Sequence, residues 1–190
     1  MSIKELEDNI KVCTLCRLYK SRKNAVPGEG NYHAKILFVG EAPGRREDEG
    51  GRPFVGNAGR LLDYALSKAN IKREEVYITN IVKCRPPNNR VPLSDEIEQC
   101  IPYLEKQIKI IDPLIICILG RTAYHALLKG NSILANRGKV INYNGRNYFI
   151  TLHPASAIYN PSLREVLIND IIKLANILND LKADSLEGYI

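Results

Sequence analysis

The 190-residue sequence contains no long hydrophobic run, no internal repeat and no low-complexity tract. A helix that spans a bilayer needs about 20 consecutive apolar residues, and no stretch of this chain approaches that length. The N-terminal residues, MSIKELEDNI, are amphipathic and acidic, whereas a signal peptide begins with a basic region and an apolar core. We therefore expect a cytoplasmic protein with no membrane partner.

The composition excludes several further classes of protein. Apolar residues make up 45% of the chain and charged residues 25%, as in ordinary globular proteins and unlike disordered, collagen-like or disulfide-rich chains. A length of 190 residues suits a single domain, 1–190, with a full hydrophobic core. The net charge of +6 is compatible with a polyanionic partner, although many proteins with such a charge bind none.

Short apolar runs alternate with helical patterns along the chain, and this alternation favours a mostly parallel sheet. The dipeptide Asn144-Gly145, flanked by apolar pairs, predicts an antiparallel ribbon before the last strand. The expected strands cover residues 35–40, 76–80, 114–120 and 148–152. The expected helices cover residues 3–12, with a capping box of Ser2 and Glu5, and residues 59–70, 94–110, 122–128 and 163–181.

Polar residues follow each expected strand. The carboxyl ends of parallel strands meet at one edge of a sheet, where loops converge and helix N-termini point at a ligand. We therefore expect four loops to build one cleft. They contain residues 40–44, Asn80, residues 120–122 and residues 153–155.

Four of the five cysteines follow the pattern C-x2-C-x67-C-x15-C, namely Cys13, Cys16, Cys84 and Cys100. A close pair completed by two distant cysteines is typical of structural zinc sites and of 4Fe-4S clusters. The alternative is a redox-active CxxC pair beside unrelated buried thiols, and the spacing does not decide among the three. Cys117 lies in the most apolar run, so we expect it in the core.

Three segments closely resemble the iron-sulfur family of uracil-DNA glycosylases, usually called family four. They are GEAPGRRED at 40–48 with GRPFVG at 51–56, TNIVKCRPP at 79–87 with Asn89 and Arg90 beyond it, and LHPAS at 152–156. The resemblance implies a three-layer α/β/α sandwich with a central four-stranded, mainly parallel sheet and an N-terminal helix. It also implies hydrolysis of the N-glycosidic bond of deoxyuridine in DNA, as in base excision repair. The four cysteines stand where this family holds a 4Fe-4S cluster, to which we assign a structural role.

The resemblance also implies a role for the residues of the cleft. Asn80 is expected to pair with the edge of a flipped-out uracil and to reject cytosine, and Phe54 to stack on the ring. His153 is expected to donate a hydrogen bond to uracil O2. Ala42 stands where the best-known branch of the superfamily has an aspartate, so Glu41 is expected to stabilise the sugar and orient water. The expected uracil-binding residues are Gly40, Glu41, Ala42, Phe54, Asn80 and His153, and the expected catalytic residues are Glu41, His153 and Asn89.

The expected DNA contacts lie on loops beside the cleft. A Pro-rich loop carries basic residues, a helix begins at residue 121, and the segment after His153 is where the superfamily inserts a wedge into the duplex. We expect a monomer acting on single- or double-stranded DNA, located with the nucleoid in a prokaryote, and residues 185–190 carry no motif that supports a sliding-clamp partner. The expected contacts are Lys83, Arg85, Arg90, Arg121, Ser156, Ile158 and Tyr159, with Ile158 or Tyr159 as the wedge.

Other interpretations of the same residues stay open. Taken singly, Phe54 is typical of a core residue, and residues 45–48 are typical of a solvated charged loop. The chain as a whole is also compatible with a DNA-binding module that keeps the cluster and has lost catalysis. A nucleotide-binding enzyme is a weaker alternative, because residues 40–44 lack both the G-x-G-x-x-G and the P-loop patterns.

Overall fold

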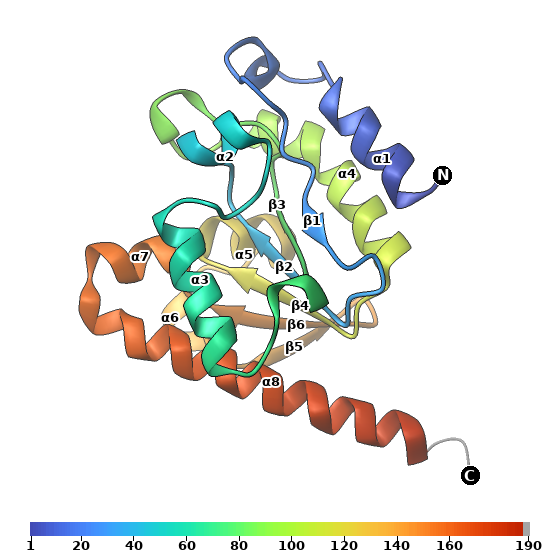
Figure 1. Ribbon diagram of the computed structural model, residues 1–190, viewed down its shortest axis with the longest axis vertical. Coiled ribbons are helices and arrows are strands. Elements are labelled where there is room, and N and C mark those ends of the chain that lie inside the picture. Colours follow the sequence, from blue (N-terminus) through green and yellow to red (C-terminus); the bar gives the residue numbers. More distant parts are fainter. Residues whose placement is uncertain (188–190) are drawn as a thin grey trace.

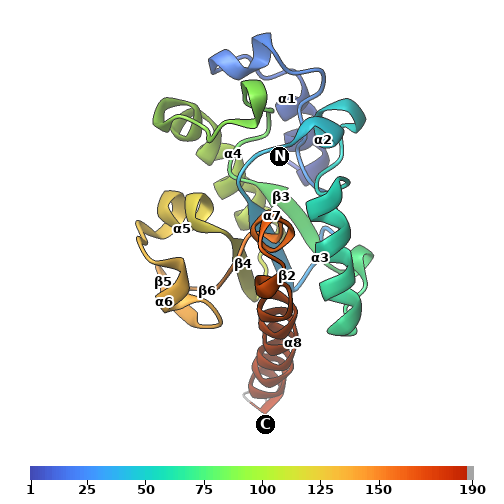
Figure 2. The same ribbon diagram turned by 90° about the vertical axis from the view of Figure 1, so that its left-hand side faces the viewer.

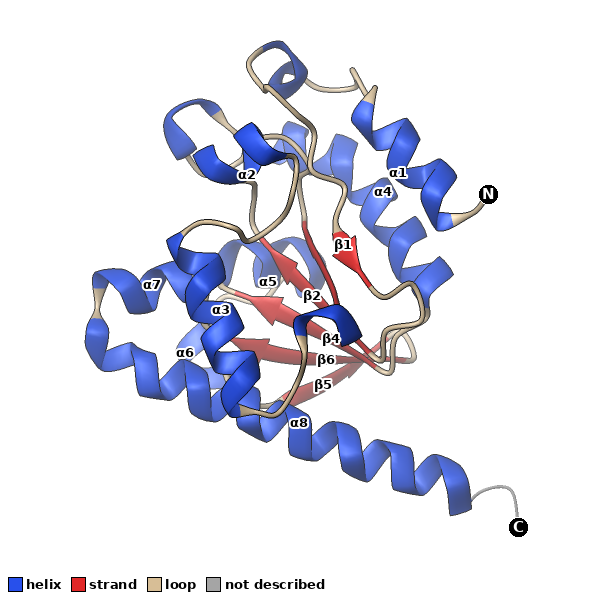
Figure 3. Cartoon of the chain, viewed as in Figure 1, coloured by secondary structure: helices blue, strands red, loops and turns tan. Residues whose placement is uncertain are grey.

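The computed structural model describes residues 1–187, and side-chain surroundings through residue 181. The described residues form one six-stranded sheet in the order β1-β3-β2-β4-β6-β5 (Figures 1 and 3). The four central strands run parallel, and β1 and β5 pair antiparallel at the two edges. The strands are β1 (Glu29–Gly30), β2 (Ile36–Gly40), β3 (Tyr77–Asn80), β4 (Ile115–Leu119), β5 (Val140–Tyr143) and β6 (Arg146–Thr151).

Helices cover both faces of the sheet, as Figure 2 shows with α3 on one side and α5 on the other. The first face is covered by α1 (Ile3–Lys11), α4 (Ser94–Ile111) and α5 (Arg121–Leu128). The second is covered by α3 (Asn57–Lys68) and α8 (Arg164–Glu187). The remaining helices are α2 (Arg45–Gly50), α6 (Ile133–Asn136), α7 (Pro154–Tyr159) and four 3-10 turns at Arg17–Lys20, Arg73–Glu75, Pro87–Asn89 and Pro161–Leu163.

The apolar runs of the central strands explain this layering. Leu37 and Val39 of β2 pack into the core below α1 and α4, whereas Ile36 and Phe38 pack into the core below α3 and α8. Because successive side chains of a strand point to opposite faces, a continuous apolar run is stable only when both faces are covered. The sequence of β2 therefore requires a three-layer structure.

The predicted fold class is confirmed. The predicted strands and helices are all found, with bounds within two residues of those expected except at the end of α8. Asn144 and Gly145 form the turn between β5 and β6, both with positive φ, as expected for this hairpin signal. Ser2 and Glu5 form the predicted capping box at α1. Cys117 is fully buried in the core, also as predicted.

Two features of the fold were not predicted from the sequence. The strand β1 has only two residues, too few to give an alternating pattern. Residues 45–48, which a solvated loop would leave exposed, belong to α2, where Asp48 is buried and accepts hydrogen bonds from the backbone amides of Lys23 and Asn24. The solvated-loop interpretation is therefore wrong for Asp48. No helix in residues 1–187 has the length and apolar character that crossing a bilayer demands.

One buried carboxylate joins α8 to the strand that leads into the cleft. Asp170 of α8 accepts a hydrogen bond of 2.7 Å from the Thr151 hydroxyl at the end of β6. It also accepts two hydrogen bonds from the Arg137 guanidinium, at 2.8 and 3.1 Å. These contacts fix the position of α8 against the end of β6.

We predict that Asp170→Ala lowers the free energy of unfolding by about 2–3 kcal/mol, because Thr151 and Arg137 both lose their partner. The exposed Asp180 of the same helix supplies the control, and Asp180→Ala is expected to change stability by less than about 0.5 kcal/mol. Urea denaturation of the three proteins measures both values. Equal stabilities of the two variants would contradict the role of Asp170.

Candidate active site and cysteine cavity

A cavity of about 500 Å³ opens at the carboxyl ends of the parallel strands. The loop after β2, the end of β3 and the segment after β6 all contribute to its walls, as the sequence predicts. The loop after β4 does not line this cavity, and Gly120 instead packs behind His153. The walls include Glu41, Ala42, Phe54, Asn80, Asn89, Arg90, His153, Ser156 and Tyr159.

Asn80 is the last residue of β3, and its side chain is 1% exposed. Within the part of the chain that the structure describes, its Oδ1 is the only buried side-chain nitrogen or oxygen without a hydrogen-bond partner. A buried carbonyl oxygen without a partner costs about 1–3 kcal/mol, so such atoms are rare and mark places where a ligand donor binds. Asn80 Oδ1 is therefore available to an N–H group in the cavity.

Gly40 makes this arrangement of side chains possible. It pairs with Asn80 across β2 and β3, and a Cβ atom at residue 40 would lie 2.5 Å from Asn80 Oδ1 and 2.6 Å from the Phe54 ring. Any larger residue would have to displace one of these two side chains. Gly40 thus contributes to the cavity through its lack of a side chain.

Phe54 forms one wall of the cavity and is held in an unusual conformation. Its φ of 49° lies in the left-handed region, which costs a residue with a Cβ atom of order 1 kcal/mol. The Arg73 guanidinium donates hydrogen bonds to the carbonyl oxygens of Pro53, at 2.6 Å, and of Phe54, at 3.1 Å. The ring centroids of Phe54 and His153 are 5.6 Å apart. The ring is buried like a core residue, but it also faces the cavity.

His153 precedes α7 as its N-cap residue. Its Nδ1 accepts a hydrogen bond of 3.1 Å from the Ala155 backbone amide, so the neutral ring carries its proton on Nε2. Burial lowers the pKa of His153 to about 4, although the nearby Glu47 carboxylate opposes the shift. At neutral pH the ring is therefore an uncharged donor.

The carboxylates of the cavity differ in what they bind. Glu47 accepts hydrogen bonds from the backbone amides of Val55, at 2.9 Å, and Gly56, at 2.7 Å, and so ties α2 to the loop that carries Phe54. Glu41 is half-buried on the cavity wall. Asn89 also lines the cavity, and its Oδ1 accepts a hydrogen bond from Arg85 Nε at 2.7 Å.

The sequence does not predict Arg73 as part of the site, and it offers Glu47 only as a further carboxylate near Glu41, not as a support of the Phe54 loop. Both act on the loop that carries Phe54 through backbone groups, and Arg73 reaches carbonyl groups 19 and 20 residues away in sequence. No local spacing rule connects residues so far apart. The signal available in the sequence was only the charge of each residue, which is typical of a solvated side chain.

The prediction that Lys83 contacts DNA is wrong. Its side chain is 1% exposed, and its ammonium donates hydrogen bonds to Thr79 Oγ1, Asn80 O and Gln107 Oε1. A group with three internal acceptors and no exposed surface cannot reach a phosphate. The sequence favours a DNA contact because Lys83 belongs to a basic, Pro-rich segment, and lysine is seldom fully buried.

Of the other predicted DNA-contacting residues, Arg90, Ser156 and Tyr159 line the cavity, whereas Arg121 lines a separate groove. Arg121 is exposed, and Tyr159, at the end of α7, is 89% exposed. Ile158 is 40% exposed. Arg90 is half-buried, and its guanidinium makes two hydrogen bonds, at 2.8 and 2.6 Å, to the buried Glu96 carboxylate, so that its charge is compensated within the chain.

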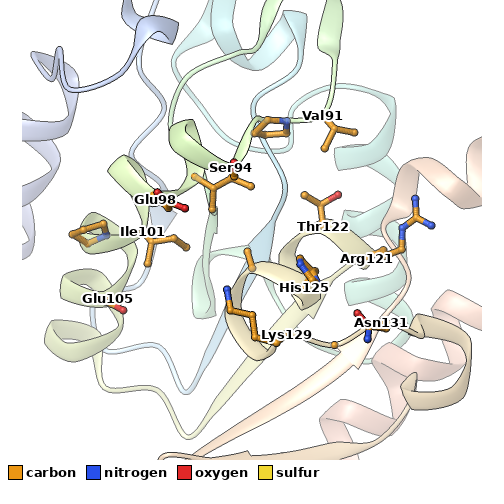
Figure 4. A pocket seen from close by; sticks show the side chains of 15 residues that line it. Val91, Ser94, Glu98, Ile101, Glu105, Arg121, Thr122, His125, Lys129 and Asn131 are labelled. Carbon is orange, nitrogen blue, oxygen red and sulfur yellow. The ribbon is translucent and has the colours of Figure 1, made fainter.

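A larger groove of about 780 Å³ lies between α4 and α5 (Figure 4). Glu98 and Glu105 lie on the α4 side, and His125 and Lys129 lie on the α5 side. The groove contains none of Glu41, Asn80 or His153. Although this groove is larger, the polar groups that converge on one point lie in the smaller cavity. The smaller cavity is therefore the candidate active site.

The four cysteines of the C-x2-C-x67-C-x15-C pattern come together in space. Cys84 and Cys100 are buried, Cys13 and Cys16 are half-buried, and all four line one small cavity beside α1 and α4. No group of three or more His, Cys, Asp or Glu side chains in residues 1–187 is placed to hold a single metal ion. This observation does not distinguish a zinc site from an iron-sulfur site.

Burial and nearby N–H donors act in opposite directions on the charge of these sulfurs. The Arg22 guanidinium donates to Cys84 Sγ at 3.0 Å, and the Lys83 backbone amide donates to Cys100 Sγ at 3.3 Å. Burial raises the pKa of the Cys100 thiol to about 12, opposed by the positive charge of Lys83. A buried thiolate is stabilised by metal coordination and by N–H donors. The donor set therefore fits a cluster held by four cysteines.

Comparisons with known proteins identify the family of the chain. Residues 27–182 match the family model described as "Uracil DNA glycosylase superfamily". The chain belongs to the uracil-DNA glycosylase superfamily. A type-4 uracil-DNA glycosylase of Saccharolobus solfataricus is 47% identical over 97% of this chain and 90% of its own length. Type-4 enzymes of Sulfurisphaera tokodaii and Thermotoga maritima are 47% and 44% identical, covering 100% and 91% of this chain and 90% and 93% of their own lengths.

The type-4 relatives confirm the family resemblance that the sequence motifs indicated. A type-5 uracil-DNA glycosylase of Pyrobaculum aerophilum is more distant, at 30% identity over 68% of this chain and 65% of its own length. The likeness to the type-4 enzymes extends over nearly the whole length of this uracil-DNA glycosylase superfamily member.

The lowered pKa of His153 predicts a pH dependence of stability in this uracil-DNA glycosylase superfamily member. Below about pH 6.5 the unfolded chain binds a proton at His153 that the folded chain excludes down to about pH 4, so stability falls across that window. Between pH 7 and pH 5 the loss is expected to be about 2 kcal/mol. Denaturation curves at both pH values measure it. His153→Gln should lose that dependence, and His125→Gln, which changes an exposed ring, should keep it.

Proposed function

We propose that this chain is a uracil-DNA glycosylase that flips uracil out of DNA and hydrolyses its N-glycosidic bond. The products are free uracil and an abasic site, as in base excision repair. The proposal is carried by the unpaired Asn80 Oδ1, buried in a cavity that also contains Phe54 and His153. The names of the type-4 relatives support the same activity.

Asn80 selects the base. Its Oδ1 accepts from uracil N3–H, and its amide group donates to uracil O4. Cytosine presents an unprotonated N3 and an amino group at these two places, so it would leave the buried Asn80 oxygen without a partner and bring two donors together. Sites built in this way reject the wrong ligand strongly, because buried polar groups are then left unpaired.

Phe54 stacks on the uracil ring. Stacking of a base on an aromatic side chain is worth about 1–3 kcal/mol in proteins that bind single strands. Arg73 holds the backbone on both sides of the Pro53–Phe54 peptide, so the ring is in place before the base arrives. The base therefore enters between surfaces that need little rearrangement.

His153 stabilises the leaving group. Cleavage places negative charge on the departing uracil, and a donor aimed at O2 binds that charge more strongly in the transition state than in the ground state. The Nε2–H of neutral His153 is this donor, because Nδ1 is occupied by the Ala155 amide. The backbone N–H groups of Glu41, Ala42 and Gly44 add further donors at the same cavity wall, whereas Pro43 has none.

Glu41 acts on the sugar. As the bond breaks, the sugar gains oxocarbenium-like positive charge, which a carboxylate stabilises while it orients the attacking water. Glu47 is committed to the backbone amides of Val55 and Gly56, whereas Glu41 lines the cavity beside Ala42. Asn89, on the opposite loop, helps to position the water.

DNA binds across the mouth of the cavity. Arg85 and Arg121 contact phosphates, and Ser156 lies at the rim, where its hydroxyl donates to His153 O at 2.6 Å. Tyr159 is the better candidate for the wedge, because it is far more exposed than Ile158 and also lines the cavity. The enzyme acts as a monomer.

The experiment that tests this function is release of uracil from a uracil-containing oligonucleotide, with no added metal or cofactor. We expect the wild-type protein to leave an alkali-labile abasic site. Asn80→Asp should lower the rate by about 100-fold and alter the preference for uracil over cytosine, because a carboxylate replaces the amide donor.

The matched control is Asn142→Asp, which makes the same change on the exposed strand β5 and should leave the rate unchanged. Tight DNA binding without uracil release by the wild-type protein would favour the inactive-module alternative. Unchanged selectivity in Asn80→Asp would refute the role of Asn80.

We also propose that Cys13, Cys16, Cys84 and Cys100 hold a structural 4Fe-4S cluster. Iron-sulfur clusters of this kind are bound by four cysteine thiolates. The chemistry assigned to the active-site residues needs no electron transfer, so the cluster supplies cross-links between the N-terminal segment, the loop after β3 and α4.

We predict that Cys100→Ala removes the cluster, seen as loss of iron and of the broad absorption band at roughly 400 nm. The variant should lose thermal stability and DNA affinity, while single-turnover cleavage at saturating DNA changes less. Cys117→Ala is the control, because this buried thiol lies in the other core and should leave the iron content intact. A Cys100→Ala protein that stays stable and binds DNA tightly but cleaves nothing would contradict the structural role.

A further inference from the structure

Lys83 makes an unusual set of contacts for a lysine. Its Nζ lies 2.6 Å from Thr79 Oγ1, 2.8 Å from the Asn80 carbonyl oxygen and 2.6 Å from Gln107 Oε1. An ammonium group has three protons, and a neutral amine has only two to donate. Three acceptors around Nζ therefore match the charged form.

This buried charge has no carboxylate partner. Among the residues that the structure describes, no Asp or Glu oxygen forms a salt bridge with Lys83. The backbone amide of Lys83 instead donates to Cys100 Sγ at 3.3 Å, and the next residue is Cys84. A buried cation without a counter-charge is strongly destabilising, and cysteine thiolates that hold a cluster would supply negative charge next to Lys83.

We propose that Lys83 is a positioning residue that joins the cysteine cavity to Asn80. Its backbone amide binds a cysteine sulfur, and its ammonium binds the main-chain carbonyl of the residue that reads uracil. The proposal deepens the proposed function and rests on it. Lys83 touches neither uracil nor DNA, so it acts only through Asn80.

The path of the chain explains why Asn80 needs such support. After β3 the backbone crosses the loop that follows β2, with Ile81 N–H bonded to Gly40 O at 2.9 Å and Val82 N–H to Glu41 O at 3.2 Å. These two hydrogen bonds hold the residues that follow Asn80. Without a further partner, the Asn80 carbonyl group would be free to change its orientation. The Lys83 ammonium fixes that carbonyl, and through it the direction of the Asn80 side chain.

Electrostatic attraction connects Lys83 to the cysteine cavity. Thiolates that bind a cluster bring negative charge beside Lys83, which stabilises the buried ammonium. Conversely, a cation close to a cluster favours the more negative, reduced form, so it raises the reduction potential. Removing the Lys83 charge should therefore change the reduction potential of the cluster. Removing a residue that contacts only Asn80 should not.

The first experiment uses Lys83→Met, which keeps the chain length and removes the charge and all three donors. It is measured as the iron-loaded protein, and rates are normalised to iron content. We expect kcat for uracil release to fall by about tenfold with little change in KM for DNA. The concentration of free uracil that half-inhibits the enzyme should rise by about tenfold, because uracil binds through Asn80.

The second experiment measures the reduction potential of the cluster. Lys83→Met should shift it to more negative values. The matched control is Lys106→Met, an exposed lysine on the same helix as Cys100, which should change neither the potential nor the inhibition by uracil. Gln107→Met removes one acceptor of the ammonium, together with the bonds from Gln107 Nε2 to Pro27 O and the Tyr77 hydroxyl, but keeps the Lys83 charge. It should weaken uracil binding and leave the potential nearly unchanged.

The outcomes separate the inference from the proposed function. A wild-type protein that releases no uracil overturns the function itself. A wild-type protein that releases uracil, with Lys83→Met equal to it in kcat and in inhibition by uracil, overturns the link to Asn80. A potential that stays the same in Lys83→Met overturns the link to the cysteines. If Lys83→Met does not fold, Gln107→Met decides the link to Asn80, because unchanged uracil binding in that variant refutes it.

Discussion

The pairing of β2 with β3 is the constraint on which the candidate site depends. Its register places Gly40 beside Asn80, and the absence of a side chain at Gly40 leaves room for both the Asn80 amide and the Phe54 ring. A shift of one residue in this register would turn the alternate residues of β3 to the opposite face of the sheet, because side chains alternate along a strand. The apolar runs buried on both faces hold the register, so the same residues that form the core also determine the geometry of recognition.

The site combines two kinds of support with opposite electrostatic demands. The cavity beside Asn80 disfavours charge on the His153 ring, whereas the cavity lined by cysteines places the Arg22 guanidinium and the Lys83 backbone amide beside sulfur. These environments lie on either side of one short segment, from Asn80 to Cys84. A substitution in that segment therefore changes both cavities. Its effects on stability and on the rate of catalysis should be coupled.

The sequence predicted the fold and the main residues of the site well, for reasons that are local. Buried strands require apolar runs, the turn at Asn144-Gly145 requires positive φ, and the loops after parallel strands must meet. It failed where a role is set by distant partners. Lysine is a residue type usually found at the surface. Only the tertiary structure brings the Lys83 ammonium within hydrogen-bonding distance of Gln107. Arg73 supports Phe54 through backbone carbonyls, which carry no side-chain identity that a sequence pattern could reveal.

The left-handed conformation of Phe54 has a consequence for how the enzyme searches DNA. The energetic cost of the strained Phe54 backbone is part of the folding free energy. The Phe54 ring therefore lies in the cavity wall before a base binds. A base extruded only briefly meets a finished surface and need not wait for a loop to close around it. For the stacking role proposed for Phe54, recognition of an extruded base would then require no rearrangement of this loop.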